Sequence, residues 1–60
     1  MASISTPELV TWAENALYVI GKEVTGWMRT KEDFLLDEAL IGGEALVAIV
    51  KELKKRSNEL

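Results

Sequence analysis

The sequence predicts an all-α protein: an antiparallel helical hairpin of two long helices that dimerises into a four-helix bundle. Two long stretches carry apolar residues at alternating spacings of three and four, which is typical of helices packed along other helices. Only a few residues separate the two stretches. Apolar residues make up 48% of the 60 residues, more than a lone hairpin can bury, because a chain of this length hides only about 60% of its unfolded surface.

The first helix is expected over residues 7–28. Thr6 is the preferred cap, with Pro7 in the first helical position and Glu8 near the positive end of the helix dipole. Ser5 is the alternative cap, with Glu8 completing a capping box. Residues 1–5 are expected to form a flexible arm.

An apolar seam runs along this helix at heptad spacing, flanked by Leu9, Trp12, Ala16 and Val19. Its members are Val10, Ala13, Leu17, Ile20, Val24 and Trp27. Gly21 interrupts the helix at a cost of up to about 1 kcal/mol relative to alanine. Gly26 offers an earlier end to the helix, but Trp27 continues the seam.

The second helix is expected over residues 31–56, with Thr30 as its cap and residues 57–60 as a frayed tail. A connection as short as residues 28–30 makes the two helices antiparallel neighbours.

Two apolar stripes lie side by side on the second helix. The first contains Leu35, Ala39, Gly42, Leu46, Ile49 and Leu53. The second contains Leu36, Leu40, Gly43, Val47 and Val50. One stripe suffices for one partner helix, so two stripes predict contact with two or more neighbours. This is the main reason to expect a second copy.

Gly42-Gly43 leaves one alternative open. Two glycines cost on the order of 2 kcal/mol inside a helix, and a break there would give a three-helix bundle that could be monomeric. The apolar positions before and after the pair point in nearly the same direction, which favours one continuous helix.

Composition limits the possible functions. The chain has no cysteine and no histidine, so disulfides and the commonest metal ligands are absent and association remains as the source of stability. A net charge of −3 argues against a strong general affinity for nucleic acid or for anionic membranes. No apolar run approaches the roughly 18 residues of a membrane span, and no secretory signal is recognisable. We therefore expect a cytoplasmic protein.

No catalytic, cofactor or metal site is expected. Serine and threonine have no histidine to activate them, and Gly42-Gly43 lacks the lysine and the hydroxyl residue of a phosphate-binding loop. The acidic residues of the second helix are interpreted as a solvated face, because carboxylate metal sites in bundles also use histidine. These residues are Glu32, Asp33, Asp37, Glu38 and Glu44.

DNA binding is the competing hypothesis. Residues 51–60 carry four basic and two acidic side chains, whereas residues 1–50 carry three basic and eight acidic ones. Ala39, Gly43 and Ile49 match part of a helix-turn-helix pattern. Glu38 and Glu52 occupy places where such a motif needs apolar residues. Cations in the last helical turn also have a simpler explanation, since they suit the negative end of the helix dipole.

The predicted function is therefore a non-catalytic protein–protein interaction or assembly module, of the kind found among phage or accessory gene products, that binds or modulates another protein. The alternative is a small dimeric DNA-binding regulator that uses the basic C-terminal tip. Trp27 and Phe34 are expected in the core. The predicted self-association interface comprises Leu35, Ala39, Gly42, Gly43, Leu46, Val47, Ile49, Val50, Leu53, Val10, Leu17 and Ile20. Candidate partner contacts are Trp12, Tyr18, Lys51, Lys54, Lys55 and Arg56.

Overall fold

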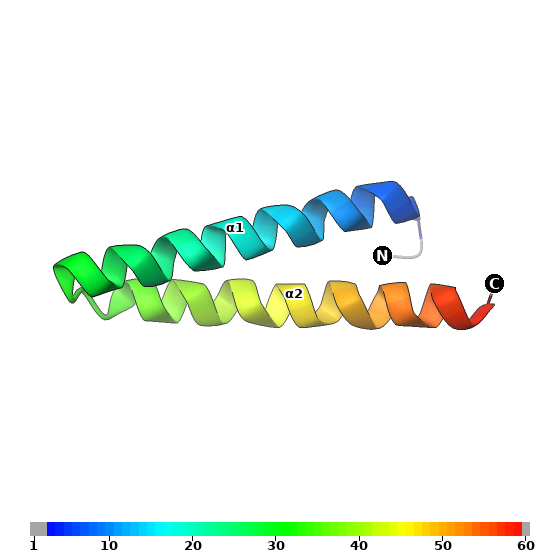
Figure 1. Ribbon diagram of the computed structural model, residues 1–60. Coiled ribbons are helices and arrows are strands. Elements are labelled where there is room, and N and C mark those ends of the chain that lie inside the picture. Colours follow the sequence, from blue (N-terminus) through cyan, green and yellow to red (C-terminus); the bar gives the residue numbers. More distant parts are fainter. Residues whose placement is uncertain (1–2, 60) are drawn as a thin grey trace.

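Two antiparallel helices make up the fold (Figure 1). The computed structural model describes residues 3–59, with helix α1 over Thr6–Thr30 and helix α2 over Phe34–Glu59. The hairpin is elongated, measuring 45 × 16 × 15 Å, and the start of α1 and the end of α2 lie at the end opposite the connection. The predicted all-α hairpin is confirmed.

Ser5, rather than Thr6, caps α1. Its hydroxyl accepts a hydrogen bond from the Glu8 backbone N–H at 3.3 Å, and its carbonyl accepts one from Leu9 at 3.1 Å. Thr6 is already helical, although a residue before proline usually avoids helical dihedrals. The preference for Thr6 was wrong because this penalty is offset by the cap that Ser5 provides. Of the predicted arm, residues 1 and 2 lie outside the described part of the chain.

The connection lies about three residues later than predicted. Thr30 does not cap α2; it ends α1, where its hydroxyl donates to the Gly26 carbonyl at 3.0 Å. Lys31 then takes a left-handed conformation, with φ 59°, and its N–H bonds the Trp27 carbonyl at 2.7 Å. This is a helix-ending geometry usually given to glycine or asparagine. Consequently α2 begins at Phe34 instead of residue 31.

Helix α2 continues unbroken through Gly42-Gly43, so the three-helix alternative is wrong. Gly42 faces α1: a Cβ built on it would lie 3.0 Å from Cγ1 of Ile20. The helices therefore come close at this point because Gly42 has no side chain. Helix α2 also extends to Glu59, so residues 57–59 of the predicted frayed tail are helical, and residue 60 lies outside the described part.

Small and medium side chains fill the space between the helices. Within the described residues, the buried apolar side chains are Leu9, Ala39 and Ile49. The first stripe of α2, whose members the sequence assigned to self-association, faces α1 within the hairpin. The heptad seam predicted for α1 is divided: Ala13, Ile20 and Trp27 lie on its less exposed side, whereas Val10, Leu17 and Val24 are exposed. The less exposed row of α1 comprises Leu9, Ala13, Ala16, Ile20, Glu23 and Trp27.

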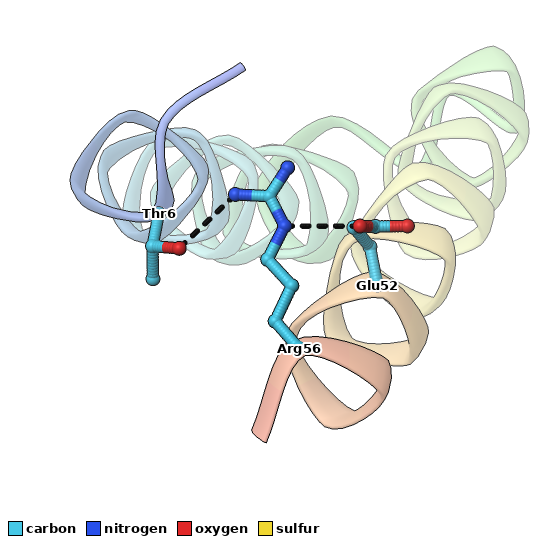
Figure 2. A network of polar contacts seen from close by, with 3 residues as sticks. All are labelled: Thr6, Glu52 and Arg56. Carbon is cyan, nitrogen blue, oxygen red and sulfur yellow. Dashed lines mark hydrogen bonds and ion pairs between the residues drawn. The ribbon is translucent and has the colours of Figure 1, made fainter. Parts of the chain in front are cut away.

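Arg56 ties the open end of the hairpin together (Figure 2). Its Nε donates to the Glu52 carboxylate at 2.9 Å, one helical turn back, and its Nη1 donates to the Thr6 hydroxyl of α1 at 3.0 Å. The guanidinium lies between the two helices, so it joins the beginning of α1 to the end of α2.

Candidate interaction surface

The hairpin leaves most of its large apolar side chains uncovered. Twelve of them are exposed in the described residues, against three buried apolar residues. The chain exposes 4675 Å² of surface, whereas a folded monomer of 6.7 kDa is expected to expose about 3,900 Å². The difference, roughly 800 Å², is close to what one partner buries in a standard protein interface. The uncovered apolar surface is therefore the candidate functional site.

Part of this surface forms one continuous aliphatic patch across both helices. Val24 of α1 lines a groove of about 820 Å³ together with Leu36, Leu40 and Val47 of α2. Leu17 and Val10 precede Val24 by one and two heptads, so they extend the same side of α1 toward the open end. We call this patch the aliphatic face. Its members are Val10, Leu17, Val24, Leu36, Leu40, Gly43, Val47 and Val50.

No member of the aliphatic face carries a charge. Charged side chains lie along its edges, and both signs are present. By helical spacing, Glu14 borders it on α1, while Lys51 and Glu44 border it on α2 and Glu44 also lines the groove. Lys54 continues the line of Val47 and Val50 toward the open end. An uncharged centre with a mixed rim is the usual composition of a protein–protein interface.

The other side of the hairpin has a different chemistry. Helical spacing places Trp12 and Val19 of α1 there, with Phe34 and Ile41 of α2, all of them exposed. We call these four residues the aromatic face. Phe34 was expected in the core and is 56% exposed. It precedes Leu35 of the inward stripe by one residue, about 100° round the helix, and so lies at the side of the hairpin and not between the helices.

The carboxylate of Glu23 lies on the same side of the hairpin as the aromatic face. Oε1 of Glu23 is buried and has no hydrogen-bond partner. The contacts between Gly42 and Ile20, and between Gly26 and Leu35, fix the alignment of the helices and place Glu23 level with Glu38. Two acidic residues therefore share one level of this side. Sequence reasoning missed Glu23 because the more apolar row through Val24 was chosen as the seam.

The predicted self-association residues divide into two sets. Seven of them lie between the two helices of a single hairpin: Leu35, Ala39, Gly42, Leu46, Ile49, Leu53 and Ile20. The other five belong to the aliphatic face: Gly43, Val47, Val50, Val10 and Leu17. The structure adds Val24, Leu36 and Leu40 to this second set through the groove that they line.

The candidate partner contacts are spread around the molecule and do not form one site. Tyr18 is exposed on the outer side of α1, where Lys22 Nζ lies 5.9 Å from its ring centroid. Lys51, Lys54 and Lys55 are exposed on different sides of α2. Arg56 is engaged by Glu52 and Thr6.

Trp27 lies at the connection and is partly covered. Its indole N–H donates to Asp33 at 3.3 Å, and Lys31 Nζ lies 4.5 Å from the ring centroid. These contacts hold the turn between the helices. The carboxylates predicted to form a solvated face, from Glu32 to Glu44, are all exposed.

Comparison of the chain with protein-family models, with curated proteins and with solved structures finds no match. In the described residues, no group of three or more acidic side chains is arranged to hold a metal ion. Neither helix in that part of the chain is long and apolar enough to cross a membrane.

Proposed function

We propose that this chain is a non-catalytic interaction module that works as a pair of hairpins closed into a four-helix bundle, and that the bundle binds or modulates another protein. The observation that carries the proposal is the excess of exposed apolar surface. In the part of the chain that the structure describes, three apolar side chains are buried and twelve large ones are exposed. Water disfavours such a surface, so covering it provides the driving force for association.

The distribution of residue sizes supports the same proposal. The contact between the helices includes the small residues Ala13, Ala16, Ala39 and Gly42 beside Leu9 and Ile49, whereas six large side chains of the aliphatic face stay exposed: Val10, Leu17, Val24, Leu40, Val47 and Val50. A chain that had to be stable alone would bury its largest apolar residues, because each contributes about 1.5–3 kcal/mol when buried. The arrangement suits a hairpin whose main core forms only on assembly.

Sedimentation equilibrium tests the pairing of hairpins. At micromolar concentration we expect about twice the chain mass of 6.7 kDa, with little change between low and moderate salt because the interface is apolar. A folded monomer under these conditions would contradict the four-helix bundle.

Affinity capture with the intact bundle tests the second half of the proposal. The bundle is expected to retain a protein from the native host. The competing regulator hypothesis rests on the exposed lysines Lys51, Lys54 and Lys55. It is less favoured because α2 has no turn at Gly42-Gly43 and Arg56 bonds to Glu52 and Thr6. Retention of duplex DNA at low salt that disappears steeply at moderate salt would support the regulator instead.

A further inference from the structure

We infer that the second copy docks on the aliphatic face, so that the two aliphatic faces form the centre of the bundle and the aromatic faces stay outside. The inference rests on the proposed pairing of hairpins and adds which of two apolar surfaces the pairing uses. Both surfaces are exposed, so exposure alone does not choose between them.

The excess of exposed surface matches the area that a second copy would bury. The hairpin exposes roughly 800 Å² more than a folded monomer of its mass should, and a standard interface removes about 800 Å² from each partner. Two identical faces related by a two-fold axis would remove this excess from both copies at once. The rim also allows self-docking, because it offers the carboxylates of Glu14 and Glu44 as well as the ammonium groups of Lys51 and Lys54.

Gly43 is a second and independent argument for this face. A glycine inside a helix costs about 1 kcal/mol relative to alanine, and Gly42 is explained by its contact with Ile20. Gly43 has no such explanation, since a Cβ built on it would meet nothing within 4 Å in the described chain. It lines the groove in the middle of the aliphatic face. A helix of the second copy that approaches closely there would account for the missing side chain.

The aromatic face is less suited to a second copy. It carries Glu23, whose buried Oε1 lacks a donor, at the same level as Glu38. Docking two such faces would bring like charges together and remove water from them, which costs free energy unless cations are supplied. On the aliphatic face Glu44 also lines the groove, but it is exposed, and Lys51 and Lys54 on the same side of α2 can supply the cations that two such faces need.

A matched pair of charge substitutions tests the choice of face. Leu17 and Val19 lie two residues apart on α1, on opposite sides of the row that faces α2, and are 63% and 46% exposed in the hairpin. In sedimentation equilibrium, Leu17→Glu is expected to weaken the dimer by about 100-fold or more, because it buries an unpaired carboxylate at the interface. Val19→Glu is expected to change the dissociation constant by less than about threefold, as for an exposed site outside the interface.

Cysteine labelling keeps the inference testable if Leu17→Glu does not fold. The chain has no native cysteine, so Val47→Cys and Ile41→Cys each introduce a single thiol on α2, at positions 55% and 64% exposed in the hairpin. At dimer concentrations, iodoacetamide should alkylate Val47→Cys at least about tenfold more slowly than Ile41→Cys, because a covered thiol is inaccessible. The two rates should become similar on dilution to monomer.

The possible failures are distinguishable. A wild-type mass of one chain overturns the four-helix bundle, and this inference with it. A wild-type dimer that dissociates with Val19→Glu but not with Leu17→Glu, or that protects Ile41→Cys instead of Val47→Cys, overturns the choice of face alone. A dimer that neither glutamate weakens, with both thiols equally reactive, also overturns it.

Discussion

Arg56 joins two parts of the chain that lie 50 residues apart in sequence. Its ion pair with Glu52 has the favourable order for a helix, with the acid one turn before the base. The hydrogen bond from Arg56 lowers the pKa of Glu52 below its ordinary value of 4.5, and the charges of Arg56 and Lys55 act in the same direction. Arg56 therefore joins the two helices at the open end of the hairpin and at the same time stabilises the ionised form of Glu52.

This link predicts a pH dependence of stability. The pKa of Glu52 is lower in the folded chain than in the unfolded chain, so in acid the unfolded state binds more protons. The stabilisation by ionised Glu52 is complete above the ordinary glutamate value and is lost as the pH falls through the lowered folded value. We expect Glu52→Gln to reduce the melting temperature at pH 7 but to differ less from the wild type at pH 3. Circular dichroism melts would contradict the prediction if the difference were the same at both pH values.

At the scale of elements, close packing of α1 on α2 depends on small residues. Gly42 leaves room for Ile20, whereas Gly21 on the other helix has open space around it. Both glycines weaken their helices, but only Gly42 makes a contact within the hairpin that a side chain would prevent. Glycine therefore permits a helix–helix contact at position 42, whereas at position 21 it only weakens the helix.

Substitution of the two glycines should change stability in opposite directions. Gly42→Leu would push a side chain into the space held by Ile20, and we expect it to lower the free energy of unfolding by about 1–3 kcal/mol. Gly21→Ala is the control and should raise it by about 0.5–1 kcal/mol, since alanine favours the helix and meets no neighbour. Urea denaturation at a fixed protein concentration measures both. No loss of stability in Gly42→Leu would contradict the close approach.

The sequence was sufficient to predict two helices and their antiparallel order, but not which stripe of α2 faces α1. It was not sufficient to predict which row of α1 faces inward. Val10, Leu17 and Val24 form a more apolar row than Leu9, Ala16 and Glu23, so periodicity and hydrophobicity favoured the row that the hairpin leaves outside. The row that faces α2 combines the small residues Ala13 and Ala16 with the larger Leu9, Ile20 and Trp27.

The ends of the helices were also predicted only approximately. Lys31 adopts a positive φ, which is not expected for a lysine. Its contact with the Trp27 ring forms only with the turn itself, so the sequence gives no sign of it. The division of the apolar residues into an inner row and an aliphatic face could not be predicted either, because it depends on how two helices align and not on either helix alone.

At the scale of the whole molecule, stability should depend on protein concentration. If the aliphatic faces of two hairpins complete the core, mass action favours the folded dimer as concentration rises. We expect the melting temperature to rise by several degrees over a hundredfold range of concentration, since a change of 1 kcal/mol shifts a domain of this size by roughly 4–8 °C. Differential scanning calorimetry measures this shift. A melting temperature that is constant over that range would be the behaviour of a self-sufficient monomer.

Both ends of the hairpin's described chain lie together, and the connection is at the far end of a molecule 45 Å long. Because the two ends of the hairpin differ, the relative orientation of two copies can be measured. A fluorescent donor on residue 3 of one copy and an acceptor on residue 3 of another would be close if the hairpins point the same way, and separated by nearly the full length of the molecule if they point in opposite directions. Energy transfer between such labels would therefore distinguish a two-fold axis parallel to the helices from one perpendicular to them.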